Sequence, residues 1–423
     1  MKRNDVAYCI LLLMAELFFA YQFMLRVYPG LVMQDIMHKF HISSTLFGML
    51  AAFYYIGYAG MQIPIGVFLD RYGPKFISLC ILICVMGSLT FLFSDNWIIA
   101  LIGRFCIGLG SVAGFLGATK VISMSFLSKY FSYMVSLTFT VGYMGAIYGG
   151  KPVALLIDKF GWEYVLIALA FIGLLIALFI LSLDIKYDET ERYEGSIYSA
   201  LKLLIKNKRV LLVCLCGALQ VGPLEAFADI WGVGYFIKMY GIAKPDAALL
   251  SSSIYLGLCV GGPIIAYIAE KYNCHYRLCS GCGVIMMMIF IMLLCTVKLQ
   301  YWQLLSLMFI IGICSGYQII VFSITAKLSD LSTNSITMSL TNMLIMSAGF
   351  AFHFIIGIIM DMSWVGSMQH NIKIYTPDSY IYSISIIPIA LGIGSIGFLL
   401  LDYKKDWDNV GNRKMNFISK ANQ

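Results

Sequence analysis

The chain has 423 residues, of which 60% are hydrophobic and 12% are charged, and its formal net charge is +7. An ordinary soluble domain is about 25% charged, so this composition is typical of a protein that crosses a membrane several times. No soluble segment combines a basic stripe with aromatic residues, which argues against nucleic-acid binding. The sequence has no nucleotide-binding loop and no nucleophile–base constellation, so we expect neither an enzyme nor a cofactor.

Apolar stretches of about 20 residues, the length that crosses a bilayer, occur twelve times along the chain. They cover residues 6–31, 44–69, 76–94, 97–120, 133–156, 161–183, 210–236, 247–269, 278–297, 302–325, 335–360 and 380–401. The first stretch is longer than the apolar core of a signal peptide and carries Glu16 and Arg26. It is therefore predicted to be a retained helix.

The positions of the basic residues predict the orientation of the chain. Outside the predicted spans, nineteen lysines and arginines fall on the side of the N-terminus and six fall on the opposite side. Cytoplasmic segments of membrane proteins are enriched in these residues. We therefore expect a multi-pass protein of the cell inner (plasma) membrane with both termini in the cytoplasm.

The second half of the sequence repeats the first. Residues 50–72 align without a gap with residues 250–272, so that Tyr55 recurs as Tyr255. A second register agrees, in which Ser132, the SLT at 136–138 and Asp158 recur as Ser335, the SLT at 339–341 and Asp361. Two parallel halves with a binding site between them at the membrane midplane form a transporter architecture.

The predicted fold is an all-α membrane protein with twelve transmembrane helices in two pseudo-symmetric six-helix halves. The halves are residues 1–183 and 210–401. A charged segment at 184–209 is predicted to be a cytoplasmic linker, and residues 402–423 a cytoplasmic tail.

Two motifs support a resemblance to a known family. GVFLDRYGPK (66–75) has the pattern Gly-x3-Asp-Arg-x-Gly-x-Lys/Arg in the loop after the second span, and RFCIGLG (104–110) places an arginine before small residues in the fourth. Both resemble motifs of the major facilitator superfamily. The resemblance implies a twelve-helix transporter that works by alternating access.

A narrower resemblance rests on AYQFMLRVYPG (20–30), MQIPIG (61–66) and the short central loop. These features are similar to the phagosomal nutrient transporter family of intracellular bacteria. That likeness implies import of amino acids or nucleosides.

Two arginines, Arg26 and Arg104, lie within predicted spans. A charge at the bilayer centre costs about 2.5–3.5 kcal/mol, so such residues normally face a protein interior or a watery cavity. The planar guanidinium suits a carboxylate or phosphate of a ligand. The alternative is that each arginine pairs with a carboxylate of the protein, Glu16 being available, and only holds helices together.

Two acids in the seventh span are predicted to face Arg26. Glu225 and Asp229 are four residues apart and therefore on one helical face, and an offset of 200 residues places Arg26 opposite position 226. Gly222–Pro223 just before them is expected to let the helix break. A cation on one wall and anions on the other suit a zwitterion. Alternatively, an acid pairs directly with an arginine in the empty protein.

The remaining candidate residues have less specific signals. Further cavity contacts are expected from Tyr21, Gln22, Gln220 and Trp231. Proton coupling is assigned to Glu16, Glu225, Asp229 and His353, although a lone histidine is equally often a satisfied core residue. An inward gate is assigned to charge pairs of Asp70, Arg71, Glu270 and Lys271 with neighbouring helix ends.

Two other groups are assigned structural roles. Lys120 is expected to reach the lipid headgroups. Cys274, His275, Cys279 and Cys282 include metal-ligand residue types, but no second ligand pair follows, so no metal is expected.

The leading interpretation is a monomeric, proton-coupled importer of a small polar metabolite, most readily an amino acid. Arg26 and Arg104 would hold its carboxylate, and Glu225 and Asp229 its amine. The alternatives are an importer of organic anions or nucleosides and a transporter-like membrane sensor. Only the substrate, protons and membrane lipid are expected as partners.

Overall fold

A computed structural model of the chain describes residues 6–184, 207–295, 298–328, 334–369 and 372–421. The first half contains α1 (Val6–Leu31), α2 (Met33–Phe40), α3 (Ser44–Gly60), α4 (Gln62–Tyr72), α5 (Phe76–Phe93), α6 (Trp97–Ser125), α7 (Ser128–Gly149), α8 (Lys151–Phe160) and α9 (Trp162–Ser182). The second half contains α11 (Lys208–Ala226), η1 (Phe227–Trp231), α12 (Gly232–Tyr240), α13 (Lys244–Tyr272), α14 (His275–Leu294), α15 (Tyr301–Ser315), α16 (Tyr317–Lys327), α17 (Asn334–Met362), β1 (Met368–Gln369), β2 (Ile372–Lys373), α18 (Pro377–Ile384) and α19 (Ile386–Ala421). Most of the predicted linker at 184–209 lies outside the described residues.

Each of the twelve predicted spans corresponds to one helix or to consecutive helices. Among the described residues, ten helical segments are long and apolar enough to cross a membrane, and α2 with α3, which meet at 110°, would make an eleventh. The predicted spans 44–69 and 133–156 are divided, because α3 gives way to α4 at Met61 and α7 to α8 at Gly150. The chain is thus a multi-pass helical membrane protein.

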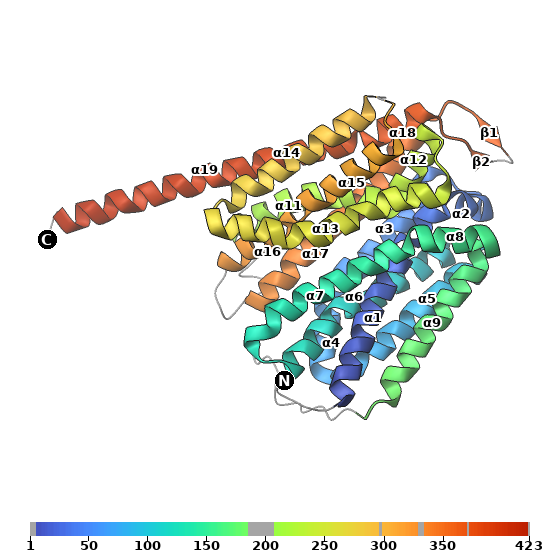
Figure 1. The fold of residues 1–423 in the computed structure, drawn as a ribbon, viewed down its shortest axis with the longest axis horizontal. Coiled ribbons are helices and arrows are strands. Elements are labelled where there is room, and N and C mark those ends of the chain that lie inside the picture. Colours follow the sequence, from blue (N-terminus) through green and yellow to red (C-terminus); the bar gives the residue numbers. More distant parts are fainter. Residues whose placement is uncertain (1–5, 185–206, 296–297, 329–333, 370–371, 422–423) are drawn as a thin grey trace.

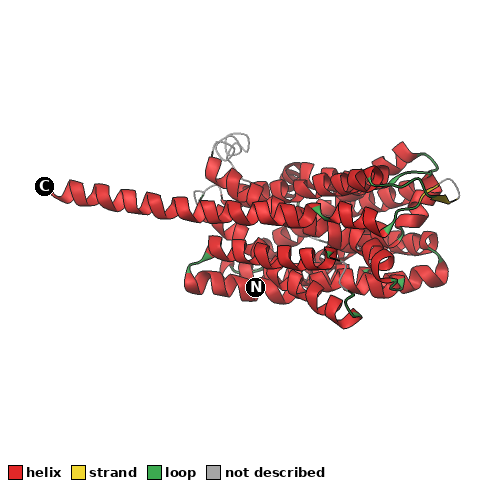
Figure 2. Cartoon of the chain, turned by 90° about the horizontal axis from the view of Figure 1, so that it is seen from above, coloured by secondary structure: helices red, strands yellow, loops and turns green. Residues whose placement is uncertain are grey.

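The helices pack first within each half and then across a seam between the halves. In Figure 1 the first half (blue to green) lies below the second (yellow to red), and Figure 2 shows α19 continuing beyond the bundle. Across the seam, α3 packs against α17, and α13 packs against α7 and α8. Since α3 and α13 are related by the sequence repeat, as are α7 and α17, the two seams are pseudo-symmetric.

Glycines allow the closest approach at the seam, as is common between membrane helices. A Cβ on Gly48 would lie 2.4 Å from the carbonyl oxygen of His353, and one on Gly357 would lie 2.5 Å from that of Ser44. Any side chain at these positions would therefore push α3 and α17 apart.

Polar contacts also join the halves at the end of the bundle where α2, the α8–α9 turn and the β1–β2 hairpin lie, here named the α2 end (Figure 1). Ion pairs and hydrogen bonds both cross the seam there. Lys151 Nζ is 2.7 Å from Asp246 Oδ1, Lys244 Nζ is 3.4 Å from Asp158 Oδ1, and the N–H of Thr45 donates to Asp361 Oδ2 at 2.8 Å. The structure therefore has its halves joined at the α2 end.

Candidate substrate site between the halves

Arg26, Glu225 and Asp229 meet between the two halves and are here named the charged cluster. Arg26 Nε donates to Asp229 Oδ2 at 2.6 Å, and Arg26 Nη2 lies 2.9 Å from Glu225 Oε1. The side chains are 6%, 0% and 11% exposed for Arg26, Asp229 and Glu225. The predicted convergence of these residues is present, in the form of direct ion pairs.

The chain segments that carry the cluster touch through their backbones. A Cβ on Gly30 of α1 would lie 2.4 Å from the carbonyl oxygen of Asp229. Asp229 belongs to η1, a π-helical segment in which the N–H of Gly232 donates to the carbonyl of Phe227. Such segments occur often at functional sites. α11 runs unbroken through Gly222–Pro223, so the expected break is wrong at that point, because Gly222 instead packs closely against Ala348.

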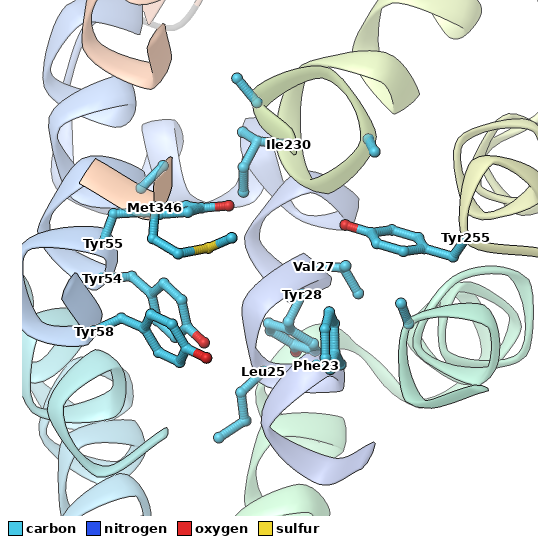
Figure 3. Packing of buried hydrophobic residues seen from close by; sticks show 14 of the residues in the cluster. Phe23, Leu25, Val27, Tyr28, Tyr54, Tyr55, Tyr58, Ile230, Tyr255 and Met346 are labelled. Atoms are coloured by element: carbon cyan, nitrogen blue, oxygen red, sulfur yellow. The ribbon is translucent and has the colours of Figure 1, made fainter. Parts of the chain in front are cut away.

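Two tyrosines complete the coordination of Asp229. Tyr55 donates to Oδ2 at 2.5 Å, and Tyr255 donates to Oδ1. Figure 3 shows the two hydroxyl groups extending toward the centre from opposite sides. These tyrosines were not predicted as site residues. The available signal was their recurrence at matching positions of the repeat.

Aromatic rings also surround the arginines. The guanidinium of Arg26 lies 5.3 Å from the ring centre of Phe23 and 5.1 Å from that of Tyr55. Arg104 Nη1 donates to the carbonyl of Leu25 at 3.0 Å, and its guanidinium lies 5.3 Å from the ring of Tyr54. Arg104 is thus buried in the first half, behind the wall that carries Arg26.

A cavity opens beside the charged cluster and is here named the central cavity. Its first-half wall includes Phe19, Phe23 and Arg26, and its second-half wall includes Glu225 and Tyr255. Its free volume is ≈ 60 Å³. The other oxygen of the buried Glu225, Oε2, has no hydrogen-bond partner among the described residues.

The four further predicted contacts lie away from this cavity. Gln22 accepts a hydrogen bond from Tyr54 at 2.7 Å. Gln220 donates to Ser395 at 3.1 Å, and the Trp231 ring packs against Phe47. The fourth, Tyr21, has its hydroxyl against α9, 2.6 Å from where a Cβ on Gly173 would lie. None of the four is among the lining residues of the central cavity: Tyr21, Gln22 and Gln220 point into their own halves, and Trp231 points across the seam into α3.

The two other proton-coupling candidates occupy separate positions. Glu16 Oε1 accepts from Thr138 at 2.5 Å, so its hydrogen-bond partner is not the arginine considered for it. His353 is fully buried, and both ring nitrogens have no partner in the described part of the chain. Its ring centre lies 5.1 Å from that of Tyr55, which links it to the charged cluster.

The predicted gate residues form contacts within each half. Asp70 pairs with Lys120 at 2.8 Å, which replaces the expected exposure of Lys120 to headgroups. Glu270 lies 2.8 Å from Lys327 and 3.0 Å from His275. In the same helix ends, the guanidinium of Arg71 lies over the Tyr72 ring and Lys271 lies over Tyr267 and Tyr272. These contacts lie within each half, and a gating role for the four residues remains a prediction.

The residues Cys274, His275, Cys279 and Cys282, near the start of α14, take part in contacts within the second half. His275 is bonded to Glu270, while Cys279 and Cys282 are buried in the helix bundle. No group of three or more possible metal ligands occurs among the described residues.

Comparison with known proteins identifies relatives over much of the chain. Uncharacterized transporters of Bacillus subtilis (strain 168), YybO, and of Rickettsia felis (strain ATCC VR-1525 / URRWXCal2) are 24% and 25% identical over 276 and 265 residues. Each match covers 58% of this chain, and the chain spans 62% and 61% of the length of these curated relatives.

Solved structures share the fold. A bacterial homolog of the human lysosomal transporter Spinster, in an inward-facing and unoccupied conformation, has a TM-score of 0.69 at 16% identity, covering 94% of this chain and 96% of that one. The nucleoside transporter NupG has a TM-score of 0.75 at 14% identity, covering 92% and 99%. The sequence profile described as Major Facilitator Superfamily matches residues 12–353. With its helical halves and the match over most of its length, the chain belongs to the Major Facilitator Superfamily, a family of transporters and not of enzymes.

Proposed function

We propose that this protein is a secondary active transporter that imports an amino acid together with protons by alternating access. The observation that carries the proposal is the charged cluster, a buried cation held between two acids where the halves meet. Intramembrane charges of this kind mark substrate and ion pathways. The orientation proposed from the basic residues puts the α2 end outside the cell membrane.

The cluster suits a zwitterion because each charge can exchange its partner. A substrate carboxylate can take the place of Glu225 or Asp229 on Arg26, whose guanidinium offers parallel donors. The displaced acid can then accept the substrate ammonium, and Glu225 Oε2 is already without a partner in the described residues. Substrate and protein would thus exchange ion pairs, and a zwitterion would add no net charge to a buried site in which an unpaired charge is costly.

Proton coupling follows from the same exchange. Protonation of Glu225 or Asp229 would neutralise one partner of Arg26 and weaken a contact that joins α1 to α11 or to η1. The buried His353 and Glu16 are further groups at which a proton could be held. The sequence has no ATP-binding motif, so accumulation against a gradient must use an ion gradient.

The proposal is tested with purified protein in liposomes. Uptake of a labelled panel of amino acids, nucleosides and organic anions is measured with an inward proton gradient, with an inward sodium gradient, and with both collapsed. We expect accumulation of an amino acid that is abolished when the proton gradient collapses, while counterflow exchange continues. Uptake of nucleosides alone would show that the substrate is a nucleoside and not an amino acid. Accumulation driven by sodium alone would show that the coupling ion is sodium and not the proton.

A further inference from the structure

The central cavity has an aromatic wall, formed mainly by α1, α6 and α7. Of the nineteen described residues that line it, eight are aromatic. The ring centres of Phe19 and Phe115 are 5.9 Å apart, those of Phe115 and Phe139 are 4.8 Å apart, and those of Phe139 and Tyr143 are 6.1 Å apart. These separations lie in the range in which aromatic pairs attract one another. The wall is therefore a continuous surface of rings.

The charges lie at one end of this wall. Arg26 and Glu225 are the charged residues among those that line the cavity. Phe23 connects them to the rings, because its ring lies beneath the Arg26 guanidinium and has its centre 5.7 Å from that of Tyr143 and 6.0 Å from that of Tyr255. A ligand whose charged head binds the cluster would extend its body along the rings.

The free volume of the central cavity is small compared with an amino acid. The cavity holds ≈ 60 Å³, less than an amino acid requires, so the rings and the opposite wall must separate when substrate enters. Separation breaks ring–ring contacts. A flat aromatic side chain can replace those contacts, whereas a small polar side chain leaves the rings unpartnered and cannot satisfy its own hydroxyl against them.

We infer that the amino acid carried by this protein has an aromatic side chain, which lies against Phe115, Phe139 and Tyr143 while its ammonium binds Glu225. The inference rests on the proposed function, and it narrows the substrate from amino acids in general to phenylalanine, tyrosine and tryptophan. Hydrogen-bonding groups on the opposite wall, Gln318 and Asn342, can receive a ring hydroxyl or an indole N–H.

The first test compares the affinities of chosen compounds for the full-length protein in detergent, by isothermal titration calorimetry. Phenylalanine and tryptophan are expected to bind at least 10-fold more tightly than threonine or serine. Phenethylamine, which lacks the carboxylate, and 3-phenylpropionate, which lacks the ammonium, are each expected to bind more weakly than phenylalanine. Threonine binding as tightly as phenylalanine would overturn the inference and leave the amino-acid transporter intact. Uridine binding without any amino acid would overturn both.

The second test uses the substitution Phe139→Leu, with Phe171→Leu as its matched control. Phe139 lines the cavity, whereas Phe171 on α9 is exposed on the outside of the bundle. Loss of one aromatic contact is expected to weaken phenylalanine binding roughly 2- to 12-fold in Phe139→Leu. Leucine binding should change much less, and Phe171→Leu should leave both affinities unchanged. Equal losses for phenylalanine and leucine would mean that Phe139 only supports the fold, and would overturn its assignment.

Discussion

Asp361 is expected to hold the halves together at the α2 end, and Asp361→Asn should loosen them. Its carboxylate accepts hydrogen bonds from the N–H of Thr45 at 2.8 Å, from Tyr375 at 2.6 Å and from Lys373 at 2.9 Å. Tyr375 in turn accepts from the N–H of Ser44 at 2.9 Å. The carboxylate also lies at the N-terminus of α3, where a negative charge is stabilised by the helix dipole.

The size of the expected effect of Asp361→Asn follows from the hydrogen bonds that asparagine cannot accept. An amide has one oxygen, so either Thr45 or the pair of Tyr375 and Lys373 would face an N–H group, and the charge is lost in any case. A hydrogen bond to a charged group contributes about 1.5–3 kcal/mol, which is roughly 10- to 150-fold in the equilibrium between closed and open forms. If the closed form held about 99% of molecules, its share would fall to about 90% or about 40% at the two limits.

The assay is a distance measurement across the seam by pulsed electron paramagnetic resonance, with bio-orthogonal spin labels at Asn96 and Val365. Both positions are exposed, and they belong to opposite halves. The matched control is Asp95→Asn, since Asp95 is exposed in the turn between α5 and α6. We expect a growing long-distance population in Asp361→Asn and none in Asp95→Asn. An unchanged distribution in Asp361→Asn, or an equal shift in both variants, would refute the reasoning.

Three further predictions concern the seam and the charged cluster. Gly48→Ala should lower the melting temperature and open the α2 end, because its Cβ would lie 2.4 Å from a backbone oxygen. The control Gly60→Ala, whose Cβ would have nothing within 4 Å, should be neutral or slightly stabilising. Equal melting temperatures for the two variants would contradict this prediction. Arg26→Lys should weaken substrate affinity roughly 10- to 150-fold despite its unchanged charge; near-normal affinity in folded protein would leave Arg26 only a packing role. Glu225→Gln, which imitates the protonated acid, should abolish proton-driven accumulation, while exchange continues at a weaker substrate affinity because the substrate ammonium loses a charged partner. Accumulation that still follows the proton gradient would remove Glu225 from the coupling path.

The sequence predicted those features that depend on a single helix or on the repeat of the two halves. Apolar length located the spans, because the bilayer thickness fixes how many residues must be apolar. The offset between the halves placed Glu225 and Asp229 opposite Arg26, since repeated halves put matching residues at matching depths.

What the sequence did not reveal depends on how each helix is rotated against its neighbours. Depth along a helix follows from a rise of about 1.5 Å per residue, but the direction of a side chain depends on tertiary packing. Gln220 and Tyr21 therefore have suitable depths yet point into their own halves. Glu16 likewise lies on the same helix as Arg26 but bonds to Thr138 on α7. The convergence of Tyr55 and Tyr255 on one carboxylate required the assembled seam.

The π-helical segment η1 (Phe227–Trp231) has a consequence for the length of the chain. A π-turn holds about one more residue than an α-turn, so η1 is equivalent to a one-residue insertion in the seventh span. Deletion of Ala228 is expected to restore a regular helix and to leave the direction of the residues that follow nearly unchanged, because the π-turn already absorbs the extra residue. Related chains without the extra residue would then need a different spacing of acids to reach the same arginine. Alignments of such chains should carry a one-residue gap between Glu225 and α12.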